Sequence, residues 1–159
     1  IGRVHFGRFL IEQGHAKDMK AVFKRFLVKG KLGYASHQWA TLQDAVRWII
    51  GAGGIAVLAH PGRYDIGSKS MDILLTLFKE MGGQGIEVVT SSHTLDMTQR
   101  YARMAQKHQL WASLGSDFHS PNEGRAEPGV LPLPPQGCEP IWHHLPLKTP
   151  LDDLWVKGN

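Results

Sequence analysis

Three residues of types that commonly bind metals, His60, Asp117 and His119, each follow a short apolar segment. His60 lies in Leu58-Ala59-His60-Pro61-Gly62-Arg63, and the other two lie in Gly115-Ser116-Asp117-Phe118-His119. Imidazole nitrogen and carboxylate oxygen together suit Zn, Mn or Fe, and an Asp-x-His sequence lets one loop supply two ligands. A histidine after a strand also serves as an ordinary hydrogen-bonding residue. The residue types therefore leave a metal site and a structural role about equally open.

The segments before these residues have the pattern of buried strands. They are short, continuous and apolar, and glycine or proline bounds them, as is typical of parallel sheets. The predicted strands cover residues 55–59, 86–89 and 110–114, and the predicted helices around them cover residues 41–51, 71–81 and 95–108. This alternation predicts an α/β fold with parallel strands, in which the three candidate ligands meet at the carboxyl edge of the sheet.

Residues 1–31 are predicted to form two short amphipathic helices, because apolar residues recur there at steps of three and four. This segment contains eight Lys or Arg against Glu12 and Asp18, a net charge of +6, whereas the whole chain carries +4. Such an excess can attract a phosphorylated ligand or nucleic acid. A solvated helix face explains it equally well.

Composition limits the remaining possibilities. One cysteine, Cys138, excludes an internal disulfide and a thiolate-rich zinc site, and it fits a reducing cytoplasm. No apolar run approaches the ~20 residues of a transmembrane helix, so no membrane partner is expected. The start at Ile1 suggests a cut inside a longer polypeptide. Proline and glycine are frequent after residue 121, and residues 130–135 allow at most a short edge strand.

The two ligand-bearing segments resemble the last two metal-ligand motifs of the PHP (polymerase and histidinol phosphatase) family. Residues 2–6, 30–34 and 52–57 further resemble its branch of small bacterial phosphoesterases, which includes 3′,5′-nucleoside bisphosphate phosphatase and ribonuclease AM. The resemblance implies the C-terminal half of a distorted (β/α)7 barrel. The implied parts are a partial helical insertion over residues 1–40, the second half of the barrel over residues 41–145, and a tail over residues 146–159.

The resemblance also implies a metal-dependent phosphoesterase with up to three divalent metals. Its substrates would be nucleoside 3′,5′-bisphosphates or short 5′-phosphorylated RNA, and His60, Asp117 and His119 would act in catalysis through the metals that they bind. The N-terminal ligand motifs of the family are absent from this sequence. The expected partner is thus the missing N-terminal half of the same protein, and the chain alone is expected to be inactive.

Arg63 is the first candidate for a contact to the substrate phosphate, because a guanidinium offers a planar fork of donors. Its alternative role is a salt bridge with Asp65 or Glu87. The best functional role of Glu87 is to support a metal-bound histidine from the predicted second strand. His93 also follows that strand, and we interpret it as a loop residue without a functional role.

Four further residues are weaker candidates for substrate contacts. Arg3 and His5 lie on the implied insertion, which in this family covers the mouth of the site and helps to select the substrate. Lys31 is another candidate for a phosphate contact, and Arg125 could close over the leaving group. Both could equally be solvent-exposed.

Two alternative functions stay open at this point. One is another PHP activity, such as hydrolysis of histidinol phosphate. The other is a non-catalytic accessory or binding module that has lost its metals. Retention of all three candidate ligands favours catalysis.

Overall fold

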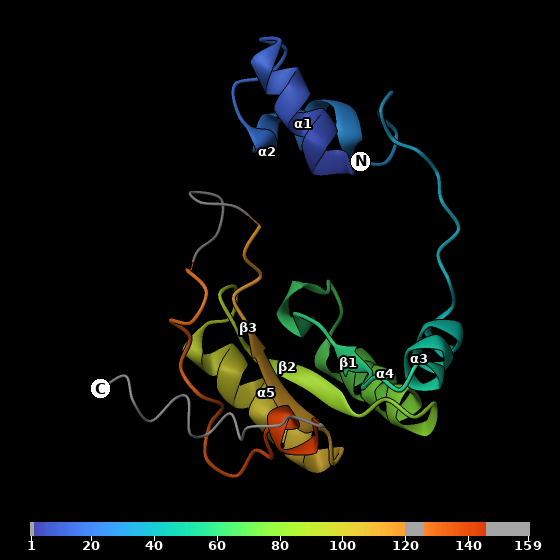
Figure 1. Ribbon diagram of the computed structural model, residues 1–159, viewed down its shortest axis with the longest axis vertical. Helices are drawn as coiled ribbons and strands as arrows, with labels where there is room; N and C mark the ends of the chain where they lie inside the picture. The colour runs from blue at the N-terminus through green and yellow to red at the C-terminus, as the bar shows by residue number, and fades with distance from the viewer. Residues whose placement is uncertain (1, 120–125, 146–159) are drawn as a thin grey trace. The chain divides into compact units, whose positions relative to one another are not determined.

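The structure is a computed structural model that describes residues 2–119 and 126–145. The chain divides into two compact units, Ile1–Trp39 and Ala40–Asn159 (Figure 1). No helix among the described residues is long and apolar enough to cross a membrane. The assignment of residues 1–40 and 41–145 to an insertion and a half-barrel stays a prediction, and the predicted tail lies outside the described residues.

The first unit consists of short helices, as its apolar periodicity predicts. Helix α1 spans Arg3–Glu12, and α2 spans Met19–Val22 and continues into a π-helical turn, η1, at Phe23–Leu27. The carboxylate of Asp18 begins α2 by accepting a hydrogen bond from the Ala21 amide at 2.7 Å. Ala16, Val22 and Leu27 form the small core of this unit.

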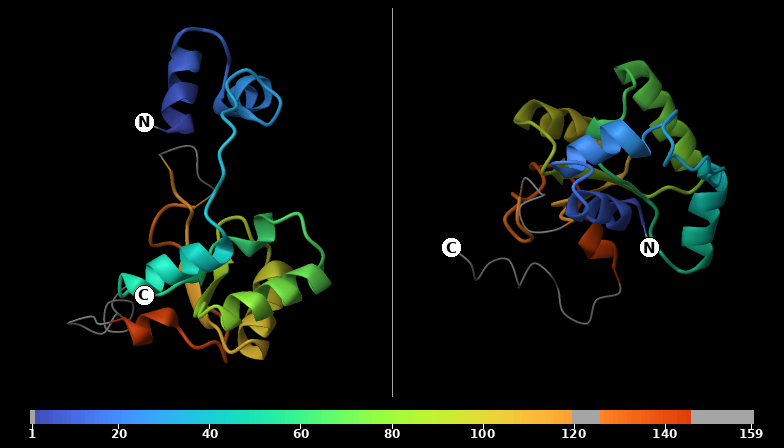
Figure 2. Two further views of the ribbon diagram at one scale, coloured as in Figure 1. Left: turned by 90° about the vertical axis from the view of Figure 1, so that its right-hand side faces the viewer. Right: turned by 90° about the horizontal axis from the view of Figure 1, so that it is seen from above.

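The second unit contains a three-stranded parallel sheet and its connecting helices. Its elements are α3 (Leu42–Gly51), β1 (Val57–Leu58), η2 (Pro61–Arg63), α4 (Ser68–Glu80), β2 (Gly85–Thr90), α5 (Leu95–Lys107), β3 (Trp111–Gly115) and η3 (Ile141–His144). The strand order is β1-β2-β3, with both pairings parallel (Figure 1). Figure 2 gives two further views of these elements. The predicted α/β class and parallel sheet are confirmed.

Several boundaries differ from the predictions, and β1 covers only Val57–Leu58 of the predicted strand 55–59. Helix α4 begins at Ser68 rather than Met71, because the polar first turn lacks the apolar residues on which the prediction relied. The described residues 126–145 form no edge strand, and only an isolated bridge joins Pro140 to Ala112. Proline lacks the amide that a longer ladder would require.

The core of this unit lies between the sheet and its helices. Met71, Leu75 and Phe78 recur at steps of three and four along α4 and are nearly fully buried. Ile86 and Val88 of β2 belong to the same cluster, and α5 contributes Tyr101, Ala102 and Ala105. The apolar residues that the sequence pattern predicts to be buried therefore pack the helices against the sheet. This packing fixes the positions of the loops that follow the strands.

Strand β2 contains an irregularity that shapes the site. Glu87 pairs with Ser113 and Val89 with Leu114, so that Val88 is an extra residue in β2. Such a bulge locally breaks the ladder and redirects the neighbouring side chains.

Candidate active site

The candidate ligands His60 and Asp117 occupy equivalent places at the carboxyl edge of the sheet. Each lies two residues beyond the end of its strand, β1 or β3. Both have left-handed backbone, with φ of 33° at His60 and 54° at Asp117. Left-handed backbone is uncommon outside glycine and is concentrated at functional sites, where the surrounding structure compensates for its strain.

Glu87 of β2 connects the loops that carry these two residues. Its Oε2 atom accepts a hydrogen bond from the amide of His60. Its Oε1 atom lies so close to the position of a Cβ at Gly115 that a larger residue there would push the carboxylate away from its place. Burial raises the pKa of Glu87, the bond from His60 opposes that shift, and the charges of Asp117 and Arg63 also act on it. The predicted supporting role of Glu87 agrees with this position, although its partner is the backbone of His60 rather than the ring.

Arg63 forms an ion pair with Asp117, in which the guanidinium nitrogen lies 2.6 Å from Oδ2. The contact lacks the alignment of a hydrogen bond, since Oδ2 is buried without a hydrogen-bond partner among the described residues. The Arg63 side chain is 50% exposed and that of Asp117 only 16%. The alternative prediction, that Arg63 pairs with Asp65 or Glu87, was therefore wrong, because its partner is Asp117. Arg63 remains accessible to a ligand at the site.

His93 ties the loop after β2 to the loop after β1. Its Nδ1 atom donates to the Val88 carbonyl oxygen at 2.9 Å, and its Nε2 atom accepts from the Gly62 amide at 3.1 Å. This pair of bonds requires the neutral Nδ1–H tautomer. Burial lowers the pKa of His93, which also favours the neutral ring.

The sequence analysis placed His93 correctly in a loop but missed this clamp. The ring stacks on Tyr101, with centroids 4.9 Å apart, and lies so close to Gly62 that a Cβ there would collide with it. A polar residue after a predicted strand was the only available signal. Its partners are backbone groups 5 and 31 residues away, and a sequence pattern does not specify them.

Buried polar atoms without hydrogen-bond partners gather at the same edge of the sheet. The described residues contain five such side-chain atoms, which belong to His60, Gln84, Thr90, Ser92 and Asp117. All except that of Gln84 lie at, or two residues beyond, the carboxyl end of a strand. Unsatisfied buried groups are few in native proteins and often mark the place of an ion or water. This clustering indicates a place for water, an ion or a polar ligand at this edge.

His119 contacts Asp117 but is more exposed than the residues of this group. Its side chain is 58% exposed, and its Nδ1 atom lies 2.7 Å from the carbonyl oxygen of Asp117 and 3.9 Å from Oδ1 of Asp117. No set of three or more His, Cys, Asp or Glu residues in the described ranges is arranged to hold a metal. The structure thus brings His60 and Asp117 to one edge without forming the expected three-ligand cluster, and the ligand roles stay predictions.

The remaining candidates lie outside this unit or outside the described residues. His5 accepts a hydrogen bond from the Gly2 amide at 3.0 Å and so helps to begin α1. Arg3 lines a groove of about 820 Å³ within the first unit, together with the exposed aromatic residues Phe6, Phe9 and Trp39. Lys31 is exposed in the turn after η1. Arg125 lies outside the described residues.

Comparison with known proteins shows that the chain is similar to proteins named as a phosphatase and as exoribonucleases. It matches no family profile. Homologues that cover about 90% of the chain are named as a phosphatase and as exoribonucleases, and the chain corresponds to their C-terminal part. These matches confirm the resemblance to the phosphatase and exoribonuclease branch that the two motifs indicated.

The particular relatives are bacterial. The chain is 52% identical over 145 residues to 3′,5′-nucleoside bisphosphate phosphatase from Chromobacterium violaceum, covering 91% of this chain and 51% of the relative. It is 42% identical over 142 residues to the 5′-3′ exoribonuclease Rnm of Escherichia coli, covering 89% of this chain and 48% of the relative. The chain therefore spans about half the length of the curated relatives that it matches.

Two solved structures agree with the fold. An amidohydrolase from Chromobacterium violaceum, described with bound sulfate and no metal, matches at 51% identity and a TM-score of 0.80, covering 91% of this chain and 50% of that chain. A protein from Bifidobacterium adolescentis matches at 24% identity and a TM-score of 0.63, covering 76% of this chain and 42% of that chain. The second likeness concerns the fold alone.

Proposed function

We propose that this chain is the C-terminal part of a metal-dependent phosphoesterase that hydrolyses nucleoside 3′,5′-bisphosphates or short 5′-phosphorylated RNA. The observation that carries the proposal is the clustering at one edge of the sheet of buried polar atoms without hydrogen-bond partners, from His60, Thr90 and Ser92, beside the ion pair of Asp117 with Arg63. The names of the relatives supply the reaction class. Within the whole protein, residues 41–145 form the second half of a distorted (β/α)7 barrel, and residues 1–40 belong to a helical insertion.

The described residues fit a metal in part. The Nδ1 atom of His60 is buried without a hydrogen-bond partner, and the carboxylate of Asp117 lies at the same edge. These two residues and His119 would hold divalent metals such as Mn, Zn or Fe, up to three in all, together with ligands from the missing N-terminal half. Bound metals would lower the pKa of a water molecule and neutralise charge on the phosphoryl group.

The protein's own groups position the reactants. Glu87 holds the His60 loop by accepting its amide hydrogen, and His93 holds the same loop through the Gly62 amide. Arg63, half-exposed beside Asp117, is placed to donate to a substrate phosphate. Arg3, His5, Lys31 and Arg125 are further substrate contacts in the proposed whole protein.

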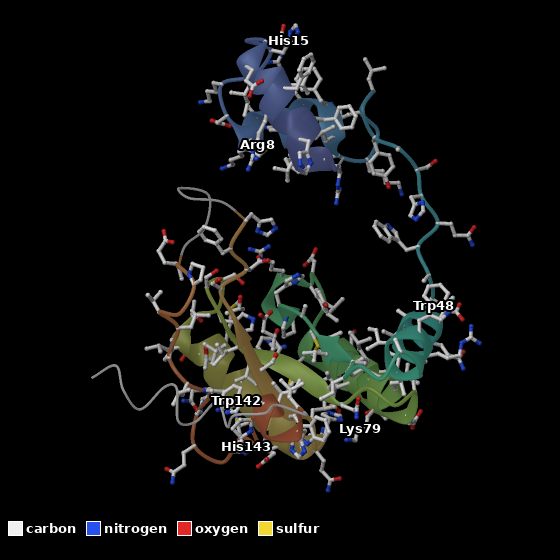
Figure 3. The ribbon with its side chains drawn as sticks, viewed as in Figure 1. Arg8, His15, Trp48, Lys79, Trp142 and His143 are labelled. Atoms are coloured by element: carbon white, nitrogen blue, oxygen red, sulfur yellow. The ribbon has the colours of Figure 1, made fainter. Side chains whose placement is uncertain are left out.

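The test uses the complete protein that contains this chain. Phosphate release from a nucleoside 3′,5′-bisphosphate and nucleotide release from 5′-phosphorylated RNA are measured with manganese, for wild type, His60→Ala and the control His15→Ala. His15 is an exposed residue of the first unit (Figure 3). His60→Ala is expected to lower kcat by about a hundredfold or more, because even groups that only support a metal ligand cost about 10–100-fold when they are lost, while His15→Ala keeps full activity.

Two results would contradict the proposal. One is the absence of turnover on both substrates, and the other is equal activity of His60→Ala and wild type. The 159-residue chain alone is expected to be inactive, because it supplies a minority of the ligands. Robust turnover by the purified chain would contradict that expectation.

A further inference from the structure

A groove of about 420 Å³ lies between helices α4 and α5, and its walls are strongly basic. Helix α4 contributes Lys69, and α5 contributes Arg100, Arg103 and Lys107. Asp72 is the single carboxylate among the lining residues, so the groove carries a net charge of +3. We call this feature the α4–α5 groove.

The cations of α5 form a row along the groove. Arg100, Arg103 and Lys107 are spaced at i, i+3 and i+7, which places them on one face of the helix. At 1.5 Å per residue, the row is about 10 Å long. It is therefore long enough to contact more than one phosphate of a nucleic-acid strand.

The single carboxylate of the groove, that of Asp72, already has partners. Asp72 lies 2.7 and 2.8 Å from the ammonium of Lys107, and it also lies 2.7 Å from Nε2 of His108. Within the described ranges, no carboxylate forms an ion pair with Lys69, Arg100 or Arg103. A solvated helix face would account for scattered charges, but three cations without a described counterion converge here from two helices.

The groove lies on the two helices that follow the loops of the candidate active site. Helix α4 begins at Ser68, five residues after Arg63. Helix α5 begins at Leu95, two residues after His93, which is bonded to Gly62. Helices that follow parallel strands run back from the carboxyl edge of the sheet. Along α5, Arg100 therefore lies nearer to the active-site edge than Arg103 and Lys107, and Lys69 lies in the first turn of α4.

We propose that the α4–α5 groove binds the sugar-phosphate backbone of an RNA substrate, downstream of the 5′ end that occupies the active site. This inference rests on the proposed function and extends it to the longer substrate. A nucleoside bisphosphate has no backbone beyond the active site, so only RNA uses the groove. The contact is electrostatic and independent of base sequence.

The experiment compares two double variants of the complete protein that each remove two positive charges. The groove variant is Arg100→Gln/Arg103→Gln. The control is Arg47→Gln/Lys79→Gln, whose residues lie on α3 and at the end of α4, outside the groove (Lys79 is labelled in Figure 3). Binding of a fluorescent 5′-phosphorylated oligoribonucleotide is measured by anisotropy in EDTA at several salt concentrations, and kcat/KM is measured separately on RNA and on a nucleoside 3′,5′-bisphosphate.

The groove variant is expected to bind RNA about tenfold more weakly than wild type. The slope of log K against log salt is expected to become shallower by about 1.4, which is 0.7 for each lost contact to a single strand. Its kcat/KM falls about tenfold on RNA and stays at the wild-type value on the bisphosphate, and the control variant changes neither.

Two outcomes would overturn the proposal that the α4–α5 groove binds RNA. One is unchanged RNA binding in the groove variant. The other is an equal loss of RNA binding in both variants, which would mean that RNA responds to the total charge of the protein and not to the groove. Failure of the proposed function would give a different result, namely no turnover of either substrate by the wild-type protein. RNA binding in EDTA does not depend on turnover, so it would still test the groove if the wild-type protein were inactive.

Discussion

Gly115 is a residue whose substitution should report directly on the packing of the candidate active site. A Cβ there would collide with Oε1 of Glu87, whereas a Cβ at Gly51 would meet nothing within 4 Å. Gly115→Ala is expected to lower the free energy of unfolding by about 1–3 kcal/mol. Gly51→Ala is expected to leave it unchanged or raise it by up to about 1 kcal/mol. Urea unfolding of the two variants measures the difference.

The collision with the Glu87 side chain should account for the loss of stability in Gly115→Ala. In a Glu87→Ala background the collision is removed, so Gly115→Ala should cost much less than it does in wild type. A double-mutant cycle measures this coupling. An equal cost in both backgrounds would mean that Glu87 does not lie over Gly115.

His93 gives a second prediction at this scale. Replacing it with Phe keeps a ring that can stack on Tyr101 but leaves the Gly62 amide and the Val88 carbonyl without their partner. Loss of stability by about 1–3 kcal/mol is expected, since buried polar groups would lose their hydrogen bonds. Hydrogen exchange should show faster exchange of the Gly62 amide.

A matched control for this variant is His37→Phe. His37 is an exposed histidine of the first unit and contacts the ring of Trp39. This variant should leave the Gly62 amide as protected as in wild type. If His93→Phe also leaves that protection unchanged, the clamp between the two loops does not exist in solution.

At the scale of elements, Asp72 links α4 to the end of α5. Hydrogen bonds from Lys107 and then from His108 hold the pKa of Asp72 below its ordinary value of 3.8. The Asp72 carboxylate therefore binds a proton less readily in the folded state than in the unfolded state. The stabilisation of the fold by the ionised carboxylate is fully present above pH 3.8 and is lost as the pH falls through the lowered pKa of the folded state.

Asp72→Asn tests this link. The variant should be less stable than wild type at about pH 6, and the difference should shrink as the pH falls below 3.8, because both proteins then have a neutral side chain at this position. Urea unfolding across this range measures the difference. The same difference in stability at both ends of the range would contradict the prediction.

The elements were largely predictable from the sequence because their signals are local. Thr41 and Thr94 begin α3 and α5 by accepting hydrogen bonds from amides three residues ahead, at 3.1 and 3.3 Å. The buried strands appear as short apolar runs. The bulge at Val88 was not predictable, since its cause is the pairing of β2 with β3 rather than any residue of β2 itself.

The site was predictable in position and only partly in contacts. Residues that follow parallel strands collect at one edge, which places His60 and Asp117 correctly. The pairing of Arg63 with Asp117 joins residues 54 positions apart, and the loop geometry selects that partner over Asp65 or Glu87. Such choices depend on backbone conformation that composition and spacing do not encode.

At the scale of the whole molecule, a protease should first cut the segment at the boundary between the two units. Residues 31–41 lie outside regular helices and strands, and their side chains are exposed. Exposed segments of this kind are the preferred sites of proteolytic cleavage. Within the described residues, chymotrypsin should therefore cut the 159-residue chain first after Tyr34 or Trp39, giving a fragment that begins at Ala35 or Ala40.

Mass spectrometry of the early fragments tests this division. The double variant Tyr34→Ser/Trp39→Ser should lose both products while the rest of the cleavage pattern stays the same. Early cuts inside α4 or α5 would contradict the assignment of Ala40–Asn159 as a compact unit.

The left-handed backbone at His60 and Asp117 affects how mutagenesis at the site must be interpreted. Alanine at either position removes the functional group and also replaces a residue type that occurs in left-handed backbone more often than alanine, so lost activity would combine two causes. Asparagine tolerates left-handed backbone better, and glycine adopts it without strain. A series of alanine, asparagine and glycine at each position would therefore separate the chemical contribution of the side chain from its conformational contribution.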